Sequence, residues 1–289
     1  MFKFSIIMSA YNAEKTIEKA INSVLKQTYD NLELVITEDC STDKTKEIIK
    51  RFDDNRIKLI EHSENLGAGW ARHNGIKAAT GDYITFLDSD DFYDLDYLEN
   101  VNNYFNDYSD IDILSCGYIS HTVENDKNTI IHVKTPEKKF YQDDLYVMDK
   151  SDTARFLVVS FIKRSLWDKV DYSTRRFCED SPTWVKILFF AKNRYMVDYA
   201  GYHYIQNPVS LIHTASRFKE SLFVTLCAIE AYNFYKEHNA DIDMRVVFQK
   251  FMQHTFEPTE EEKKLYANEI NEVSDFIKNN IDKFLKNEN

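Results

Sequence analysis

The acidic run Asp88-Ser89-Asp90-Asp91 contains the residues best suited to chemistry in this chain. Asp88 and Asp90 stand at positions i and i+2 after an apolar stretch, so both can point into one crevice and offer hard oxygen ligands to Mg²⁺ or Mn²⁺. Taken alone, such a run is more often a solvated turn or a helix start, because Asp and Ser are common capping residues. A phosphatase would use the same strand end with Asp88 as its nucleophile, but the downstream Lys and acidic pair that it requires cannot be assigned.

The charge of the chain limits the ligands that it can accept. The 289 residues include 36 Lys and Arg against 48 Asp and Glu, which gives a formal net charge of -12. No dense basic face is available to neutralise a phosphate backbone, so no nucleic-acid partner is expected. A diphosphate would need a bound cation or a few well-placed basic side chains, because a carboxylate-rich cleft would otherwise repel it.

Cysteine spacing and the length of the apolar runs indicate a reduced chain without a membrane span. The four cysteines are widely separated and form no CxxC pair, so neither a zinc knuckle nor a disulfide framework is expected. No apolar run approaches the ~18 residues that a span requires. We therefore expect a cytoplasmic protein, and peripheral contact at the inner face of the cell membrane stays open.

The first 116 residues alternate short apolar runs with helical patterns, which predicts an α/β fold with a parallel sheet covered by helices. Strands are expected at residues 4–8, 32–37, 56–61, 83–87 and 111–116, and helices at residues 13–24, capped by Asn12, at 43–52, capped by Ser41 or Asp43, and at 69–79. Polar clusters follow three of the strands, at residues 9–12, 38–43 and 88–91. The carboxyl ends of the strands form the ligand crevice of such sheets, so these clusters should face one another.

An ordered series of motifs resembles the family 2 glycosyltransferases of the GT-A fold. The motifs are Ser5-Ile-Ile-Met-Ser-Ala-Tyr-Asn12, Ser23-Val-Leu-Lys-Gln-Thr28, Glu38-Asp-Cys-Ser-Thr-Asp-Lys-Thr45, Asn65-Leu-Gly67, Ala71-Arg-His-Asn-Gly75 and Asp88-Ser-Asp-Asp91. Their order and spacing make the resemblance specific over the first third of the chain. It implies a Rossmann-like, mostly parallel sheet flanked by helices. It also implies inverting transfer of a hexosyl or N-acetylhexosaminyl group from a UDP-sugar to a hydroxyl of a glycan or lipid-linked acceptor, in bacterial surface polysaccharide synthesis.

The resemblance also assigns a role to each matching residue of the donor site. Asp39 would hydrogen-bond the base, which a carboxylate does well because it accepts the N3–H of uracil. Arg72 would approach the nucleotide or the diphosphate, and Asp90 would contact Mn²⁺ or Mg²⁺ together with Asp88. The remaining residues that would line the nucleotide pocket are Ala10, Tyr11, Glu14 and Ser89. Two departures from the family pattern, Ser9 in place of Pro and Glu38 in place of Asp, leave this chemistry intact.

A second landmark, Glu179-Asp180, resembles the acidic pair that carries the catalytic base of the family. Asp180 is the candidate base, and Glu179 stands beside it. Without the upstream motifs, this pair would be interpreted as the acidic start of a helix. His213 lies where related enzymes carry a polar loop, and its imidazole is a candidate third metal ligand, although a lone His is more often a hydrogen-bonded surface or core residue.

The helical pattern and the resemblance together predict three parts of the chain. Residues 1–118 would form the nucleotide-sugar-binding half of the GT-A domain, residues 119–215 the acceptor-binding and catalytic half, and residues 216–289 a C-terminal helical extension. The middle part contains a turn at residues 125–128 between two β-rich runs, which predicts a hairpin. The extension would contact a lipid-linked acceptor at the membrane or pair with a second copy in a homo-oligomer.

Two other classes of protein remain as alternatives to a glycosyltransferase. A metal-dependent nucleotidyltransferase could use the same acidic strand end, although the sequence lacks a Gly-rich phosphate loop with a Lys near the first strand. A nucleotide-binding or scaffold module acting through its helical tail would not need the acidic residues Asp39, Asp88, Asp90 and Asp180.

Overall fold

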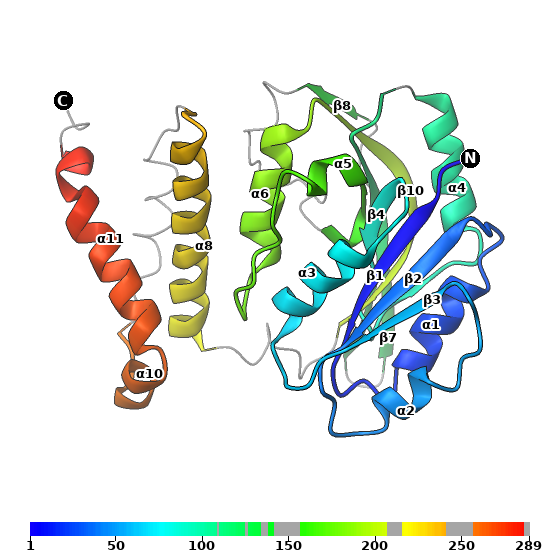
Figure 1. Cartoon of the computed structure of the whole chain (residues 1–289), viewed down its shortest axis with the longest axis horizontal. Coiled ribbons are helices and arrows are strands. Elements are labelled where there is room, and N and C mark those ends of the chain that lie inside the picture. The colour runs from blue at the N-terminus through cyan, green and yellow to red at the C-terminus, as the bar shows by residue number, and fades with distance from the viewer. Residues whose placement is uncertain are drawn as a thin grey trace. The chain divides into compact units, whose positions relative to one another are not determined.

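The computed structural model describes residues 1–108, 110–124, 127–133, 138–141, 157–206, 216–240 and 257–285. The chain divides into two compact units (Figure 1). The first consists of Met1–Arg176 and Ile187–Gln206, and the second of Phe177–Lys186 and Asn207–Asn289. His213 and residues 125–126 of the predicted turn lie outside the described residues, whereas Lys127 and Asn128, also predicted in the turn, begin a strand.

Ten strands of the described residues form one sheet in the first unit, in the order β3-β2-β1-β4-β9-β6-β10-β5, with β7 beside β6 and β8 beside β10. Pairing is parallel through β3, β2, β1 and β4 and again between β6 and β10, and antiparallel elsewhere. The strands are β1 (Phe4–Ala10), β2 (Leu32–Glu38), β3 (Ile57–Glu61), β4 (Tyr83–Phe86), β5 (Phe92–Tyr93), β6 (Ile113–Glu124), β7 (Lys127–Val133), β8 (Lys138–Tyr141), β9 (Ser160–Lys163) and β10 (Asn193–Ile205).

Alternation along β1 explains how helices cover both faces of the sheet. Phe4, Ile6 and Met8 point to one face and share a hydrophobic core with residues of α1 (Ile17–Leu25) and α4 (Tyr97–Asp107). Ile7 points to the opposite face, toward α3 (Ala68–Ala78), which packs across β1 and β2 (Figure 1). A Cβ at Gly75 would lie 2.6 Å from Ile7 Cγ2, so this helix needs glycine to approach the sheet so closely.

The predicted strands are confirmed, with end shifts of one to a few residues, and β6 is much longer than expected. The predicted hairpin is confirmed in its pairing, because β6 and β7 run antiparallel from Glu124 and Lys127 onward. The helix cap at Asn12 is wrong. The helix begins only at Ile17, and Asn12, with a φ of 49°, accepts a hydrogen bond from Thr42 N–H at 2.9 Å. A contact with the next loop has replaced the local cap.

Further helices complete the two units. The first unit also contains α2 (Thr45–Ile49), α5 (Arg164–Trp167) and a 3₁₀ turn at Leu157–Val159. Helix α6 (Asp180–Phe190) begins in the second unit, which also holds α8 (Arg217–Glu237), α10 (Glu260–Leu265) and α11 (Ala267–Leu285). Phe223 of α8 packs against Phe177 and Tyr266 within the second unit. None of the described helices combines the length and the apolar character needed to cross a bilayer.

A buried carboxylate joins the amino ends of the sheet strands. Glu33 of β2 is 9% exposed, and its Oε1 accepts hydrogen bonds from Ser5 Oγ and Thr80 N–H, each at 2.6 Å. Lys3 Nζ lies 3.1 Å from Oε2. Burial alone would raise the pKa of Glu33, but the hydrogen bonds from Ser5, Thr80 and Lys3 lower it to about 2. The ionised form is therefore the one that the folded state stabilises.

We predict that Glu33→Gln lowers the free energy of unfolding by about 1–3 kcal/mol at pH 7, because the substitution weakens charge-assisted bonds in a buried site. The pKa of Glu33 is lower in the folded chain than the ordinary value of about 4.3, so its contribution exists above that value and is lost as the pH falls toward 2. Urea denaturation at pH 7 and pH 2.5 measures this. The loss of unfolding free energy caused by Glu33→Gln should be smaller at pH 2.5 than at pH 7. Glu64→Gln, at an exposed position, serves as the control. A loss that is the same at both pH values would contradict the assignment of an ionised Glu33.

Candidate active site

Three polar segments follow the carboxyl ends of neighbouring strands. Strand β1 lies between β2 and β4 with parallel pairing on both sides, so residues 9–12, 38–43 and 88–91 leave the sheet at the same edge. Asp39 N–H donates to Ala10 O at 2.9 Å, and Leu87 N–H donates to Ile7 O at 3.0 Å. The sheet therefore brings together three clusters that lie far apart along the sequence.

The first two segments interlock through the loop after β1. Glu14 N–H donates to Asp43 Oδ2 at 3.0 Å, and Glu14 Oε2 accepts from Lys44 N–H at 3.2 Å. Ala10 is fully buried, whereas the side chain of Tyr11 is 47% exposed. Of these expected pocket residues, Tyr11 and Glu14 are thus exposed, and Glu14 also holds the loop through Asp43 and Lys44.

Asp39 is buried at the end of β2, where three donors surround its carboxylate. His62 Nδ1 lies 2.7 Å from Oδ1, Leu66 N–H donates to Oδ1 at 2.9 Å, and Gly67 N–H donates to Oδ2 at 2.8 Å. Gly67 has a φ of +92°, a left-handed conformation that glycine adopts without strain. Sequence reasoning did not identify His62, although it directly follows β3 just as the other site segments follow their strands.

Arg72, carried by α3, reaches the end of β4. Its Nη2 donates to Asp88 Oδ1 at 2.6 Å, and its Nη1 donates to the hydroxyl of Tyr172 at 3.4 Å. The Arg72 side chain is 15% exposed, and that of Asp88 is 32% exposed. A guanidinium is therefore fixed beside the first carboxylate of the acidic run, where an anionic ligand could also meet it.

The other acidic residues of the run differ in their surroundings. Asp91 is buried, and its carboxylate accepts hydrogen bonds from the Tyr202 hydroxyl and from Ile205 N–H. The same hydroxyl accepts from Asp88 N–H at 3.4 Å, so Tyr202 of β10 ties together both ends of the run. Burial and the charges of neighbouring carboxylates raise the pKa of Asp91. Asp91 therefore anchors the turn, and the half-buried segment from Asp88 to Asp90, including Ser89, faces the site.

The donor atoms at this strand end suit a divalent cation. Asp88 and Asp90 supply carboxylate oxygens, which Mg²⁺ and Mn²⁺ prefer. Burial and the charge of Asp88 raise the pKa of Asp90 to about 6, and a cation bound between the two would favour the ionised form again. In the part of the chain that the structure describes, no three His, Cys, Asp or Glu side chains are arranged to hold a metal. Further ligands would have to come from the substrate or from elsewhere in the chain.

The expected acidic pair Glu179-Asp180 belongs to the second unit. Glu179 is buried, and its carbonyl accepts a hydrogen bond from Thr183 Oγ1 at 2.8 Å. Asp180 is the first residue of α6 and is partly exposed, with Ser181 Oγ 3.4 Å from its Oδ1. An acidic residue in the first turn is favourable for the helix dipole, and partial exposure leaves its carboxylate accessible to a proton donor.

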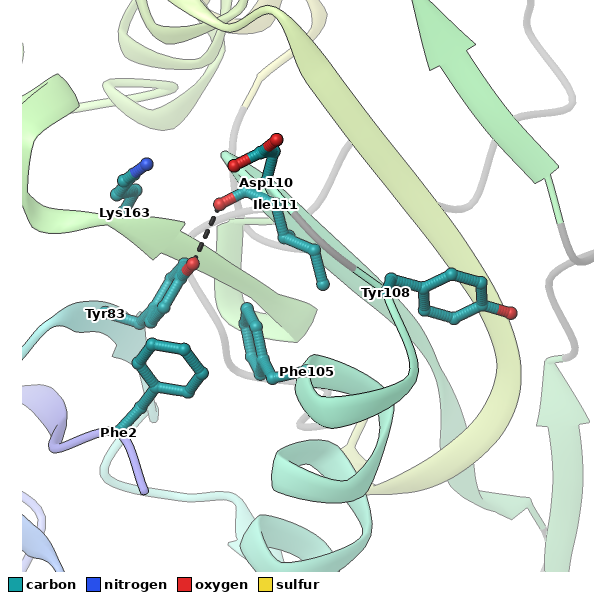
Figure 2. Close-up of a pocket in the computed structure, with 7 residues that line it drawn as sticks. All are labelled: Phe2, Tyr83, Phe105, Tyr108, Asp110, Ile111 and Lys163. Atoms are coloured by element: carbon teal, nitrogen blue, oxygen red, sulfur yellow. Dashed lines mark hydrogen bonds between the residues drawn. The ribbon is translucent and has the colours of Figure 1, made fainter.

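A cavity of about 280 Å³ lies at the other end of the sheet. Figure 2 shows its lining residues, Phe2, Tyr83, Phe105, Tyr108, Asp110, Ile111 and Lys163. Phe2 precedes β1 and Tyr83 begins β4, whereas Asp88 follows the carboxyl end of β4. Aromatic rings fill most of the wall, and the Tyr83 hydroxyl donates to Ile111 O at 2.8 Å (Figure 2). This cavity is therefore separate from the site formed by the three polar segments.

Two relatives illustrate what the sequence is similar to. The UDP-Glc:alpha-D-GlcNAc-diphosphoundecaprenol beta-1,3-glucosyltransferase WfgD of Escherichia coli is 50% identical over 95 residues, which are 33% of this chain and 38% of that enzyme. The putative teichuronic acid biosynthesis glycosyltransferase TuaG of Bacillus subtilis is 29% identical over 212 residues, 71% of this chain and 81% of that protein. The stronger identity is thus confined to about a third of each chain.

Two solved structures share the fold. S. aureus TarS 1–349 in complex with UDP-GlcNAc has a TM-score of 0.65 at 21% identity, covering 87% of this chain and 71% of that one. The mannosyltransferase PcManGT from Pyrobaculum calidifontis in complex with GDP-Man and Mn²⁺ has a TM-score of 0.59 at 19% identity, covering 88% and 68%. This likeness confirms the expected GT-A fold. The family described as Glycosyl transferase family 2 matches residues 5–170, more than half of the sequence, and the chain belongs to that family.

Proposed function

We propose that this glycosyltransferase moves a hexosyl or N-acetylhexosaminyl group from a UDP-sugar to a hydroxyl of a glycan or lipid-linked acceptor, with inversion at the anomeric carbon. Asp39 would bind the base, Asp88 and Asp90 would hold Mn²⁺ or Mg²⁺ at the diphosphate, and Asp180 would act as the base. The biological setting would be the synthesis of a bacterial surface polysaccharide at the cytoplasmic side of the membrane.

One observation carries the proposal: two distinct carboxylate sites follow β2 and β4, on either side of β1. Asp39 is buried and held by three donors, as suits a group that recognises a neutral base. Asp88 and Asp90 are less enclosed, and Asp88 pairs with the Arg72 guanidinium, as suits two carboxylates that bind a charged ligand. A nucleotide diphosphate has a neutral base at one end and charge at the other, and it matches this pair of sites.

The relatives support the choice of donor and acceptor. WfgD is named for UDP-glucose as donor and for a diphosphoundecaprenol-linked GlcNAc as acceptor, and its 50% identity falls in a segment of 95 residues. TarS shares the fold and was solved with UDP-GlcNAc. We therefore propose a UDP-sugar over other nucleotide sugars and a lipid-linked acceptor over a free glycan.

The proposed mechanism assigns a separate task to each carboxylate. Asp180 would accept the proton of the acceptor hydroxyl as its oxygen attacks the anomeric carbon, on the face opposite the diphosphate. The bond from that carbon to the diphosphate would break, and its electron pair would leave with the diphosphate oxygen. A bound divalent cation would stabilise the negative charge that grows there. Arg72 would keep Asp88 oriented and would itself face the same charge.

The second unit is the proposed place of acceptor contact. It contains Asp180 together with helices α8, α10 and α11. A lipid-linked acceptor would require these helices to approach a membrane surface, and His213, near the end of the acceptor-binding half, would complete the metal ligands. Pairing with a second copy through the same helices is the other use that we propose for the extension.

We predict that Asp90→Asn lowers turnover of the preferred UDP-sugar by about 100-fold or more, because the substitution removes a charged ligand from the diphosphate site. Release of UDP from a panel of UDP-sugars, with Mn²⁺ and with chelator, measures the effect. Asp53→Asn, in an exposed loop, is the matched control and should retain wild-type activity. A preferred donor should also raise the melting temperature with Mn²⁺, by mass action. If no UDP-sugar is bound or turned over, the proposal fails in favour of a scaffold module or another nucleotide enzyme.

A second prediction separates the base from the donor site. Asp180→Asn should lower kcat by about 10²–10⁴-fold, while UDP binds with unchanged affinity, because the substitution removes the proton acceptor and leaves the first unit intact. Steady-state kinetics together with calorimetric titration of UDP measure both quantities. Asp275→Asn, an exposed change in α11, is the control. If Asp180→Asn retains kcat while Glu179→Gln loses it, the base is Glu179.

A further inference from the structure

The carboxylate of Asp39 is restrained by a side chain that the family motifs do not include. His62 follows β3, and its backbone N–H donates to Glu38 O at 2.9 Å, which places it beside Asp39 in the neighbouring strand. The two side chains are almost completely buried, at 7% and 3% exposure. The distance from His62 Nδ1 to Asp39 Oδ1 is 2.7 Å. Such a buried contact fixes the orientation of both groups.

Asn74 of α3 determines which nitrogen of His62 carries the proton. Asn74 Nδ2 lies 2.9 Å from His62 Nε2, and an amide nitrogen can only donate. His62 Nε2 must then accept, and in the neutral ring the proton resides on Nδ1. His62 therefore donates to Asp39, and the tautomer follows from the neighbour on the opposite side of the ring.

The donors around Asp39 leave its two oxygens unequal. Among the described residues, Oδ1 accepts from His62 and from Leu66 N–H, and Oδ2 accepts from Gly67 N–H alone. Each carboxylate oxygen accepts about two hydrogen bonds. Oδ1 is therefore saturated, and Oδ2 retains a single acceptor position.

A single acceptor position distinguishes between nucleobases. The pairing edge of uracil has one donor, N3–H, between two carbonyl groups. The corresponding edge of guanine has two adjacent donors, N1–H and N2–H, which a carboxylate satisfies only with both oxygens. A base that leaves a donor unpaired in a desolvated site is bound more weakly. The fold itself does not decide between them, since PcManGT was solved with GDP-Man.

We propose that His62, held in one tautomer by Asn74, saturates Oδ1 of Asp39 and thereby makes the base site selective for uracil over guanine. His62 is a positioning residue in this scheme, because it acts through Asp39 and does not touch the substrate. The inference rests on the proposed function, in which Asp39 binds the base.

The test compares the affinities for UDP and GDP, with Mn²⁺ present, in wild type and in two variants at this position. His62→Phe keeps a ring but removes the donor to Asp39. His62→Asn keeps a donor near the place of Nδ1. We expect wild type to prefer UDP, His62→Phe to lose at least about tenfold of that preference, and His62→Asn to stay within about threefold of wild type, since a discriminating hydrogen bond is worth roughly a factor of ten.

Calorimetric titration of both nucleotides into the same preparation makes the ratio independent of the folded fraction, because misfolded protein lowers the apparent binding of both alike. N3-methyl-UDP, which lacks the N3–H donor, should bind wild type at least about tenfold more weakly than UDP. An unchanged UDP-to-GDP ratio in His62→Phe, or equal affinities in wild type, overturns the role of His62. Failure of wild type to bind any of these nucleotides would instead overturn the proposed function.

Discussion

A carboxylate that is buried away from water must accept hydrogen bonds or pair with a cation. This constraint shapes both the scaffold and the site of the protein. Glu33 meets hydroxyl, amide and ammonium donors and remains ionised with a pKa of about 2. Asp39 meets an imidazole and two backbone amides. Asp91 meets a phenol and one amide, and its pKa is raised. Each of these groups joins segments that are distant in the sequence, so their satisfaction depends on the whole sheet.

Asp88 and Asp90 are satisfied less completely than the three buried carboxylates. Arg72 pairs with Asp88, while burial and the charge of Asp88 raise the pKa of Asp90 to about 6. Unrelieved negative charge at a strand end costs stability, and a ligand that brings positive charge recovers it. The same scaffold thus combines buried carboxylates, which hold loops in place, with the less enclosed pair Asp88 and Asp90.

The loops at the carboxyl edge are held by cross-strand contacts more than by their own local structure. Asp39 fixes the amides of Leu66 and Gly67 just before α3, the helix that carries Arg72. Tyr202 holds the acidic run from the far side, through Asp88 N–H and the Asp91 carboxylate. A mutation in either contact would therefore displace a charged group of the site without changing that group itself.

The sequence by itself determined the strand positions, the polar clusters after β1, β2 and β4, and the family, because apolar periodicity and motif order are local properties of the chain. Only the tertiary structure decided which partners those clusters take. Tyr202 lies 111 positions from Asp91, and His62 lies 23 positions from Asp39. Asn12 likewise does not cap the helix as predicted, and instead accepts a hydrogen bond from Thr42 N–H, 30 positions away. Such contacts depend on which strands lie side by side, and no local pattern in the sequence encodes that adjacency.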